Sequence, residues 1–130
     1  HLNADALFEE VYSNFKKFPE FRSENLEISM ADALMSGFAM FSLKDPSLLA
    51  FDERRNNDGK LMNLKSVYGI GKVPCDTTMR KILDDVTLGN FNTSFKTIFS
   101  KIQRGGALSP MKYIQGHYIL SVDGTGFFSS

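Results

Sequence analysis

Apolar residues recur every three or four positions through most of the chain, and proline or glycine repeatedly interrupts the pattern. This spacing places apolar side chains on one face of a helix, whereas Pro and Gly end helices. The pattern predicts a mainly α fold, a bundle of about six helices: 5–17, one starting near Ser29, 46–55 with Asp45 as its cap, 61–68, one starting after Asp76, and 91–103. The second of these is apolar over most of its surface, so we expect it at the centre of the core.

The pattern changes after Pro110. Residues 117–123 contain β-branched and aromatic residues in a near-continuous apolar run, which predicts a β-strand followed by a turn at 123–126. A single strand cannot satisfy its own backbone groups. We therefore expect a helical domain over 1–112 and, over 113–130, the start of a domain whose sheet continues past residue 130. A hairpin with a distorted segment upstream, or pairing with another molecule, is the alternative.

The charges of the chain are unevenly distributed although they sum to zero. Residues 1–53 carry ten acidic and four basic residues, a net charge of −6, whereas 54–122 carry eleven basic and four acidic residues, a net charge of +7. This asymmetry points to a polyanionic partner for the second part, and pairing of acids and bases across the fold is the alternative. No apolar run is long enough for a membrane helix, no signal pattern is present, and Cys75 is the single cysteine. We expect a cytoplasmic protein with no membrane partner.

The segment from Tyr68 to Leu83 is similar to a helix-turn-helix: a short helix, a glycine-containing connection and a second helix. The second helix would present Thr, Arg and Lys outward, which suits phosphates and base edges, and its positive N-terminal end would favour a phosphate. The connection is longer than usual, and Asp84 and Asp85 add negative charge, so a solvated helix is the alternative. The candidate DNA-binding residues are Thr77, Thr78, Arg80, Lys81, Lys65 and Lys72.

Asp123 is the strongest candidate for catalytic chemistry. It ends the predicted strand and precedes a Gly-Thr-Gly turn, so its carboxylate would project from the rim of a sheet, where a magnesium site often begins. An ordinary Asp-Gly turn is the alternative. Cys75 and His117 have no partners at metal-ligand or catalytic spacing, which favours structural roles for both.

Four runs of sequence resemble the N-terminal region of bacterial insertion-sequence DDE transposases. They are SMADALMSG at 29–37, FSLKDPSLL at 41–49, PCDTTMRKIL at 74–83 and GHYILSVDGTG at 116–126. The resemblance covers roughly residues 18–130 and is most specific from 116 onward.

This resemblance implies that an RNase H-like catalytic domain with an Asp-Asp-Glu triad follows the helical region. Asp123 would be the first acid and would bind Mg²⁺ or Mn²⁺ only together with two downstream acids, so we expect this chain alone to be inactive. The intact protein would cut and join DNA at element ends in the bacterial cytoplasm, associated with the nucleoid. The helical part would recognise transposon-end DNA or help to assemble the transposase. A homodimer is a further expected partner.

Two other interpretations are kept open. In the first, the acidic, Phe-rich first half is a non-catalytic dimerisation or protein-interaction module that makes no contact with DNA, and salt-dependent binding to duplex DNA would distinguish it from a DNA-binding domain. In the second, the chain is a complete small metal-dependent nuclease. Cleavage with Mg²⁺ would support that interpretation, but Asp123 is the single acid on a plausible strand.

Overall fold

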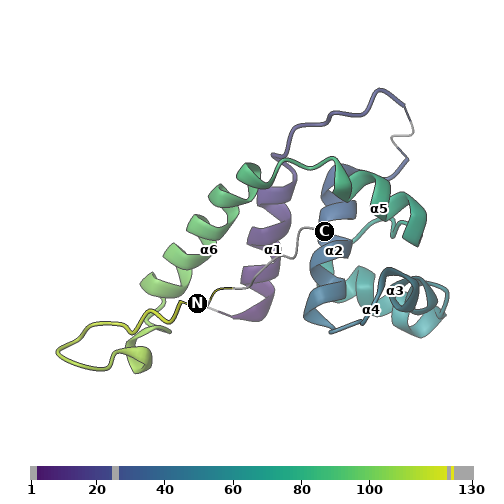
Figure 1. The fold of residues 1–130 in the computed structure, drawn as a ribbon. Coiled ribbons are helices and arrows are strands. Elements are labelled where there is room, and N and C mark those ends of the chain that lie inside the picture. Colours follow the sequence, from purple (N-terminus) through teal and green to yellow (C-terminus); the bar gives the residue numbers. More distant parts are fainter. Residues whose placement is uncertain (1–2, 25–26, 123, 125–130) are drawn as a thin grey trace.

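The computed structural model describes residues 3–24, 27–122 and 124, and over these residues it contains six α-helices and two single 3₁₀ turns (Figure 1). The elements are α1 (Ala4–Phe15), α2 (Met30–Ser42), α3 (Leu48–Arg55), α4 (Asp58–Tyr68), α5 (Asp76–Asp84), η1 (Leu88–Asn90), α6 (Phe91–Arg104) and η2 (Ser109–Met111). The predicted helical bundle is therefore confirmed. Within the described ranges, no helix combines the length and the apolar character that a bilayer span requires.

Helix α2 lies at the centre of the bundle, as predicted. It packs against α1 on one side and against α4 and α5 on the other, whereas α6 lies on the far side of α1 (Figure 1). Ten of the 13 residues of α2 are buried. Phe41 is an exception to this burial, because its side chain is 74% exposed. It faces the open side between α2 and α6, which no other described element fills.

Two aromatic clusters join the helices. Phe8 of α1 stacks on Tyr68 at the end of α4, with ring centroids 5.1 Å apart, and meets Phe38 of α2 edge to face. At the other end of α1, Phe18 and Phe91 pack with ring centroids 5.0 Å apart. Offset and edge-on aromatic pairs stabilise a fold beyond the area they bury. The first cluster therefore fixes α4 to α1 and α2, and the second fixes the start of α6 to the end of α1.

The starts of α3 and α4 differ from the prediction. Ser47, rather than Asp45, caps α3, because its hydroxyl accepts the backbone N–H of Ala50 at 3.1 Å. Asp45 instead forms a bidentate ion pair with Arg54, with N–O distances of 2.7 and 2.8 Å. Helix α4 begins at Asp58, three residues before the prediction, because Asn57 caps it. Asn and Ser are good N-caps as well as loop residues, and the tertiary contacts decide between the two uses.

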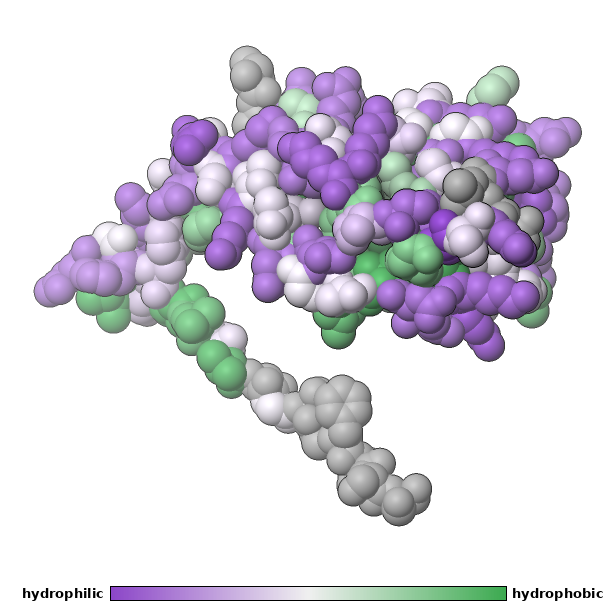
Figure 2. All heavy atoms as spheres, turned by 90° about the horizontal axis from the view of Figure 1, so that it is seen from above, coloured by the Kyte–Doolittle hydropathy of each residue, from purple (hydrophilic) through white to green (hydrophobic). Residues whose placement is uncertain are grey.

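The C-terminal segment forms no β-strand within the described residues, in contrast to the prediction for 117–123. The segment forms a single antiparallel bridge between Lys112 and Tyr118, closed by a tight turn in which Gln115 and Gly116 have positive φ angles. Figure 2 shows the segment projecting from the helical body with apolar side chains on it. A strand needs a partner along its length, and no described residue provides one beyond Tyr118. The described part of 113–130 therefore does not show the predicted start of an RNase H-like sheet.

Candidate nucleic-acid interface

Helix α5 is held in the bundle by one face and exposes the other. Met79 and Ile82 are buried, and α5 packs against α2 and α3. The helical repeat then places Thr77, Arg80 and Lys81 at the surface and leaves Thr78 half-buried. The outward face predicted from the spacing is thus confirmed for Thr77, Arg80 and Lys81 and only in part for Thr78. The predicted partner helix is placed differently, because α4 packs mainly on α1, α2 and α3 rather than on α5.

The carboxylate of Asp32 fixes the loop that leads into α5. It accepts hydrogen bonds from the backbone N–H groups of Gly71 and Lys72, at 3.0 and 3.1 Å, and from the hydroxyl of Tyr12, at 2.9 Å. Burial and the Asp32 carboxylate raise the pKa of Tyr12 to about 12. The hydroxyl of Ser29 caps α2 by accepting the N–H of Asp32, and the carboxylate of Asp32 bonds to the loop rather than back to Ser29. Asp32 therefore connects α1, α2 and the loop before α5.

Sequence reasoning missed this function of Asp32. The available signal was an acid among alanines on a helix that is otherwise apolar, which requires a partner if the helix is buried. Gly71 is the matching residue, since an added Cβ would lie 3.3 Å from the Asp32 carboxylate oxygen. The pair lies 39 positions apart, so local pattern cannot identify it.

The two threonine hydroxyls of α5 are already engaged. The Asp76 carboxylate accepts the backbone N–H of Thr77 at 2.6 Å and its hydroxyl at 3.0 Å. Thr78 pairs with the thiol of Cys75 at 3.2 Å, and this hydrogen bond lowers the pKa of Cys75. A carboxylate in the first turn interacts favourably with the positive N-terminal end of the helix dipole. The expectation that this end would receive a phosphate is therefore not supported, since Asp76 occupies the position.

The four predicted cations lie in different environments. Lys72 forms an exposed ion pair with Glu27 at 2.9 Å, which lowers the pKa of Glu27. Arg80, Lys81 and Lys65 form no ion pair with any residue that the structure describes. Lys65 belongs to α4 and is not brought to the outer face of α5. The cations available on that face are therefore Arg80 and Lys81.

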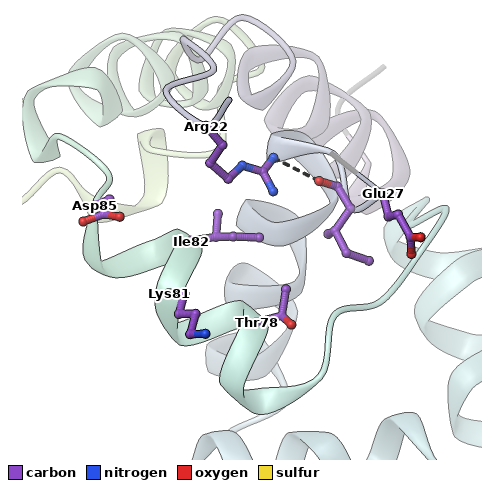
Figure 3. Close-up of a pocket in the computed structure, with 7 residues that line it drawn as sticks. Arg22, Glu27, Thr78, Lys81, Ile82 and Asp85 are labelled. Atoms are coloured by element: carbon purple, nitrogen blue, oxygen red, sulfur yellow. Dashed lines mark hydrogen bonds between the residues drawn. The ribbon is translucent and has the colours of Figure 1, made fainter. Parts of the chain in front are cut away.

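A pocket of about 330 Å³ lies beside this face, between α5 and the segment that precedes α2 (Figure 3). Lys81 and Thr78 line it from α5, and Arg22 lies on the opposite side. The Arg22 guanidinium is held by the Glu20 carboxylate at 2.6 and 2.7 Å and by the carbonyl of Ile28 at 3.0 Å. Glu27 and Asp85 also line the pocket. Because bases and acids are both present, the pocket offers donors and acceptors rather than a purely cationic surface.

An apolar groove forms a second candidate surface. It has a volume of about 540 Å³ and runs over α1, between α2 and the end of α5 on one side and α6 on the other. Phe38 and Phe41 line it from α2, Leu83 lies at the end of α5, and Phe91 and Phe95 come from α6. The helical spacing of apolar residues in 91–103 predicts a face turned away from water, but Phe95 and Phe99 are 68% and 54% exposed. The pattern identified the apolar face correctly, but nothing described covers much of it.

The predicted catalytic residue, Asp123, lies outside the described residues. Within the described ranges, no three His, Cys, Asp or Glu side chains come together as metal ligands. The role of Asp123 in binding Mg²⁺ or Mn²⁺ thus remains a prediction that depends on the sequence resemblance.

Comparison of the chain with protein-family models, with curated proteins and with solved structures gives no match.

Proposed function

We propose that the helical unit binds duplex DNA through the outer face of α5, as the N-terminal region of an insertion-sequence DDE transposase. The observation that carries the proposal is the pair Arg80 and Lys81. Both side chains are exposed on a helix held by buried Met79 and Ile82, and neither forms an ion pair with a described residue. Cations of this kind neutralise phosphates and release counterions.

The loop before α5 adds to the proposed surface. Lys72 lies two residues before Pro74, and its backbone is anchored by Asp32. Its ion pair with Glu27 is exposed on both sides, so a phosphate can replace the carboxylate at small cost. We assign the contacts to phosphates rather than to base edges, because Thr77 and Thr78 already use their hydroxyls within the helix.

The proposed assignment to the transposase family rests on the resemblance of four sequence runs, at 29–37, 41–49, 74–83 and 116–126. In that family the cutting and joining of DNA strands would require Asp123 together with two acids from outside this chain. The proposal therefore gives this chain recognition of element DNA without catalysis.

The test is fluorescence-anisotropy titration of a labelled DNA duplex over a series of salt concentrations. The Arg80→Ala, Lys81→Ala double variant should bind more weakly and should lower the magnitude of the salt slope by about 2, since each phosphate contact contributes about 1. The matched control is Lys60→Ala with Lys112→Ala, which removes the same charge elsewhere and should leave the slope near that of the wild type. Equal losses in both variants would indicate a nonspecific charge effect and contradict the proposal.

A second candidate function, a non-catalytic interaction module without DNA contact, is favoured by the apolar groove and its exposed Phe side chains. It predicts no binding of the wild type to duplex DNA even at low salt.

A further inference from the structure

We propose that the apolar groove is the contact surface of a twofold dimer, in which α6 of each copy lies in the groove of the other. The partner is thus a second copy of this chain. The inference concerns a different surface from the outer face of α5, and it does not depend on DNA binding.

The first argument is the amount of apolar surface. Phe41, Leu88, Phe95 and Phe99 are 74%, 80%, 68% and 54% exposed. Phe41, Leu88 and Phe95 line the groove, and Phe99 follows Phe95 one turn later on α6. With roughly 150–250 Å² for each Phe side chain and somewhat less for Leu88, these four residues expose on the order of 500 Å² per copy, or about 1,000 Å² for a pair. Stable protein interfaces bury about 1,200–2,000 Å² in total, with an apolar centre and a polar rim. The apolar centre of a dimer of ordinary size is therefore present, and the charged rim adds the rest.

The second argument is self-complementarity. Helix α6 lines the groove with Phe91, Phe95 and Ile98, while Phe95 and Phe99 also stand exposed on it. Residues four positions apart form a ridge on a helix, and such a ridge fits a groove between helices. In a twofold interface the same patch acts on both copies. Helix α6 can then act both as the wall of its own groove and as the ridge that enters the other.

The third argument is charge. Helix α6 contains Lys96, Lys101 and Arg104 and no acidic residue. At the end of α5, the exposed Asp84 and Asp85 lie between Leu83 and Val86 in the sequence, and these two apolar residues line the groove; Asp85 also lines the pocket of Figure 3. Lys101 is paired with Glu10 in its own chain at 2.6 Å. Among the described residues, Lys96, Arg104, Asp84 and Asp85 form no ion pair, so the basic helix of one copy matches the acidic rim of the other.

The test is sedimentation velocity of the full chain without DNA. The wild type should form a concentration-dependent dimer, and Phe95→Glu with Phe99→Glu should weaken dimerisation by at least ~30-fold, the size expected for central interface residues. The matched control is Leu49→Glu, which places a charge at an exposed apolar position of α3 and should leave the dimer intact. Circular dichroism checks that each variant keeps its helix content.

A charge exchange tests the same interface without touching its apolar residues. Asp84→Lys should weaken the dimer, and Asp84→Lys combined with Lys96→Glu should restore part of the affinity. The proposal is overturned if the wild type remains a monomer up to about 100 μM, a concentration that would populate even a weak specific dimer. It is also overturned if Ile119→Asp with Leu120→Asp abolishes the dimer while the Phe95 and Phe99 changes do not, because the C-terminal segment would then be the contact. If the wild type dimerises but does not bind duplex DNA even at low salt, the proposed function is contradicted and the dimer proposal stands.

Discussion

Helices α2 and α6 are nearly equal in length, 13 and 14 residues, and both have apolar residues at helical spacing, yet their surroundings are opposite. Ten residues of α2 are buried, whereas Ser94 is the one buried residue of α6. The polar groups differ in the same way. In α2, the Asp32 carboxylate accepts hydrogen bonds from three donors. The Ser36 hydroxyl donates to the backbone carbonyl of Asp32 at 2.7 Å. The Ser94 hydroxyl of α6 is buried with no hydrogen-bond partner among the described residues.

This difference shows what apolar periodicity can establish. It identifies the face of a helix that avoids water, but it does not specify which molecule covers that face. In α2 the covering elements belong to the same chain. In α6 one side packs on α1, and the neighbouring side carries Phe95 and Phe99 at the surface.

The largest expected effect comes from truncating one apolar side chain in each helix. Met35 of α2 is fully buried, so Met35→Ala should lower the free energy of unfolding by about 2–5 kcal/mol, because it leaves a cavity. Phe95→Ala in α6 should cost about 1 kcal/mol, since most of its side chain already faces water. Urea unfolding at low protein concentration measures both. Equal losses would mean that the two helices contribute equally to the core.

The second prediction concerns the polar connection of α2. Asp32→Ala should lower the free energy of unfolding by about 2–3 kcal/mol, because it leaves the Gly71 and Lys72 N–H groups without an acceptor. The control is Tyr12→Phe, which removes a single hydrogen bond and should cost about 1 kcal/mol. Thermal unfolding followed by circular dichroism gives both values. An Asp32→Ala variant as stable as Tyr12→Phe would disprove the anchoring of the loop.

The third prediction is that replacing two buried serines by alanine changes the free energy of unfolding in opposite directions. Ser94→Ala should stabilise the fold by roughly 0.5–1 kcal/mol, because it removes a buried hydroxyl that makes no hydrogen bond. Ser36→Ala should destabilise it by about 1 kcal/mol, since that hydroxyl is hydrogen-bonded and fully buried. Chemical denaturation of the pair provides the comparison. The same sign for both substitutions would contradict it.

The smallest effect concerns the ion pair that connects α6 to α1. Lys101 lies 2.6 Å from Glu10, and this contact lowers the pKa of Glu10 from its ordinary value of 4.5. Its stabilisation is therefore fully present above pH 4.5 and is lost as the pH falls through the lower pKa of the folded state. Glu10→Gln should cost up to about 0.5 kcal/mol at neutral pH and nothing at a pH well below both pKa values. Glu9→Gln, at an exposed position without an ion pair to a described residue, should show no such pH-dependent loss.

Much of the fold could be predicted from the sequence because its signals are local. The Ser29 cap and Gly69, which ends α4 in the left-handed conformation, follow from residue type and position alone. The predicted strand at 117–123 depended on a partner, and residue pattern does not supply one. The start of α4 at Asp58 was missed because an Asn-Asn-Asp-Gly run is typical of a loop.

Prediction of the candidate site was less complete for a similar reason. The spacing of Met79 and Ile82 correctly indicates that Arg80 and Lys81 face outward. It does not indicate that Asp76 and Cys75 already engage the threonines, or that Lys72 pairs with Glu27, 45 positions away. Competition between neighbouring polar groups is decided by geometry, which residue type does not give.

The anchoring of the loop by Asp32 has a consequence for the order of folding. Its hydrogen bond to Gly71 closes a loop of 39 positions, and the entropic cost of closure grows with the logarithm of loop length. Helices α3 and α4 lie within that loop, and their formation shortens the path between its ends. We therefore expect α5 to dock late, after the rate-limiting barrier. Substitution of Asp32 should then accelerate unfolding and leave the refolding rate almost unchanged in stopped-flow experiments.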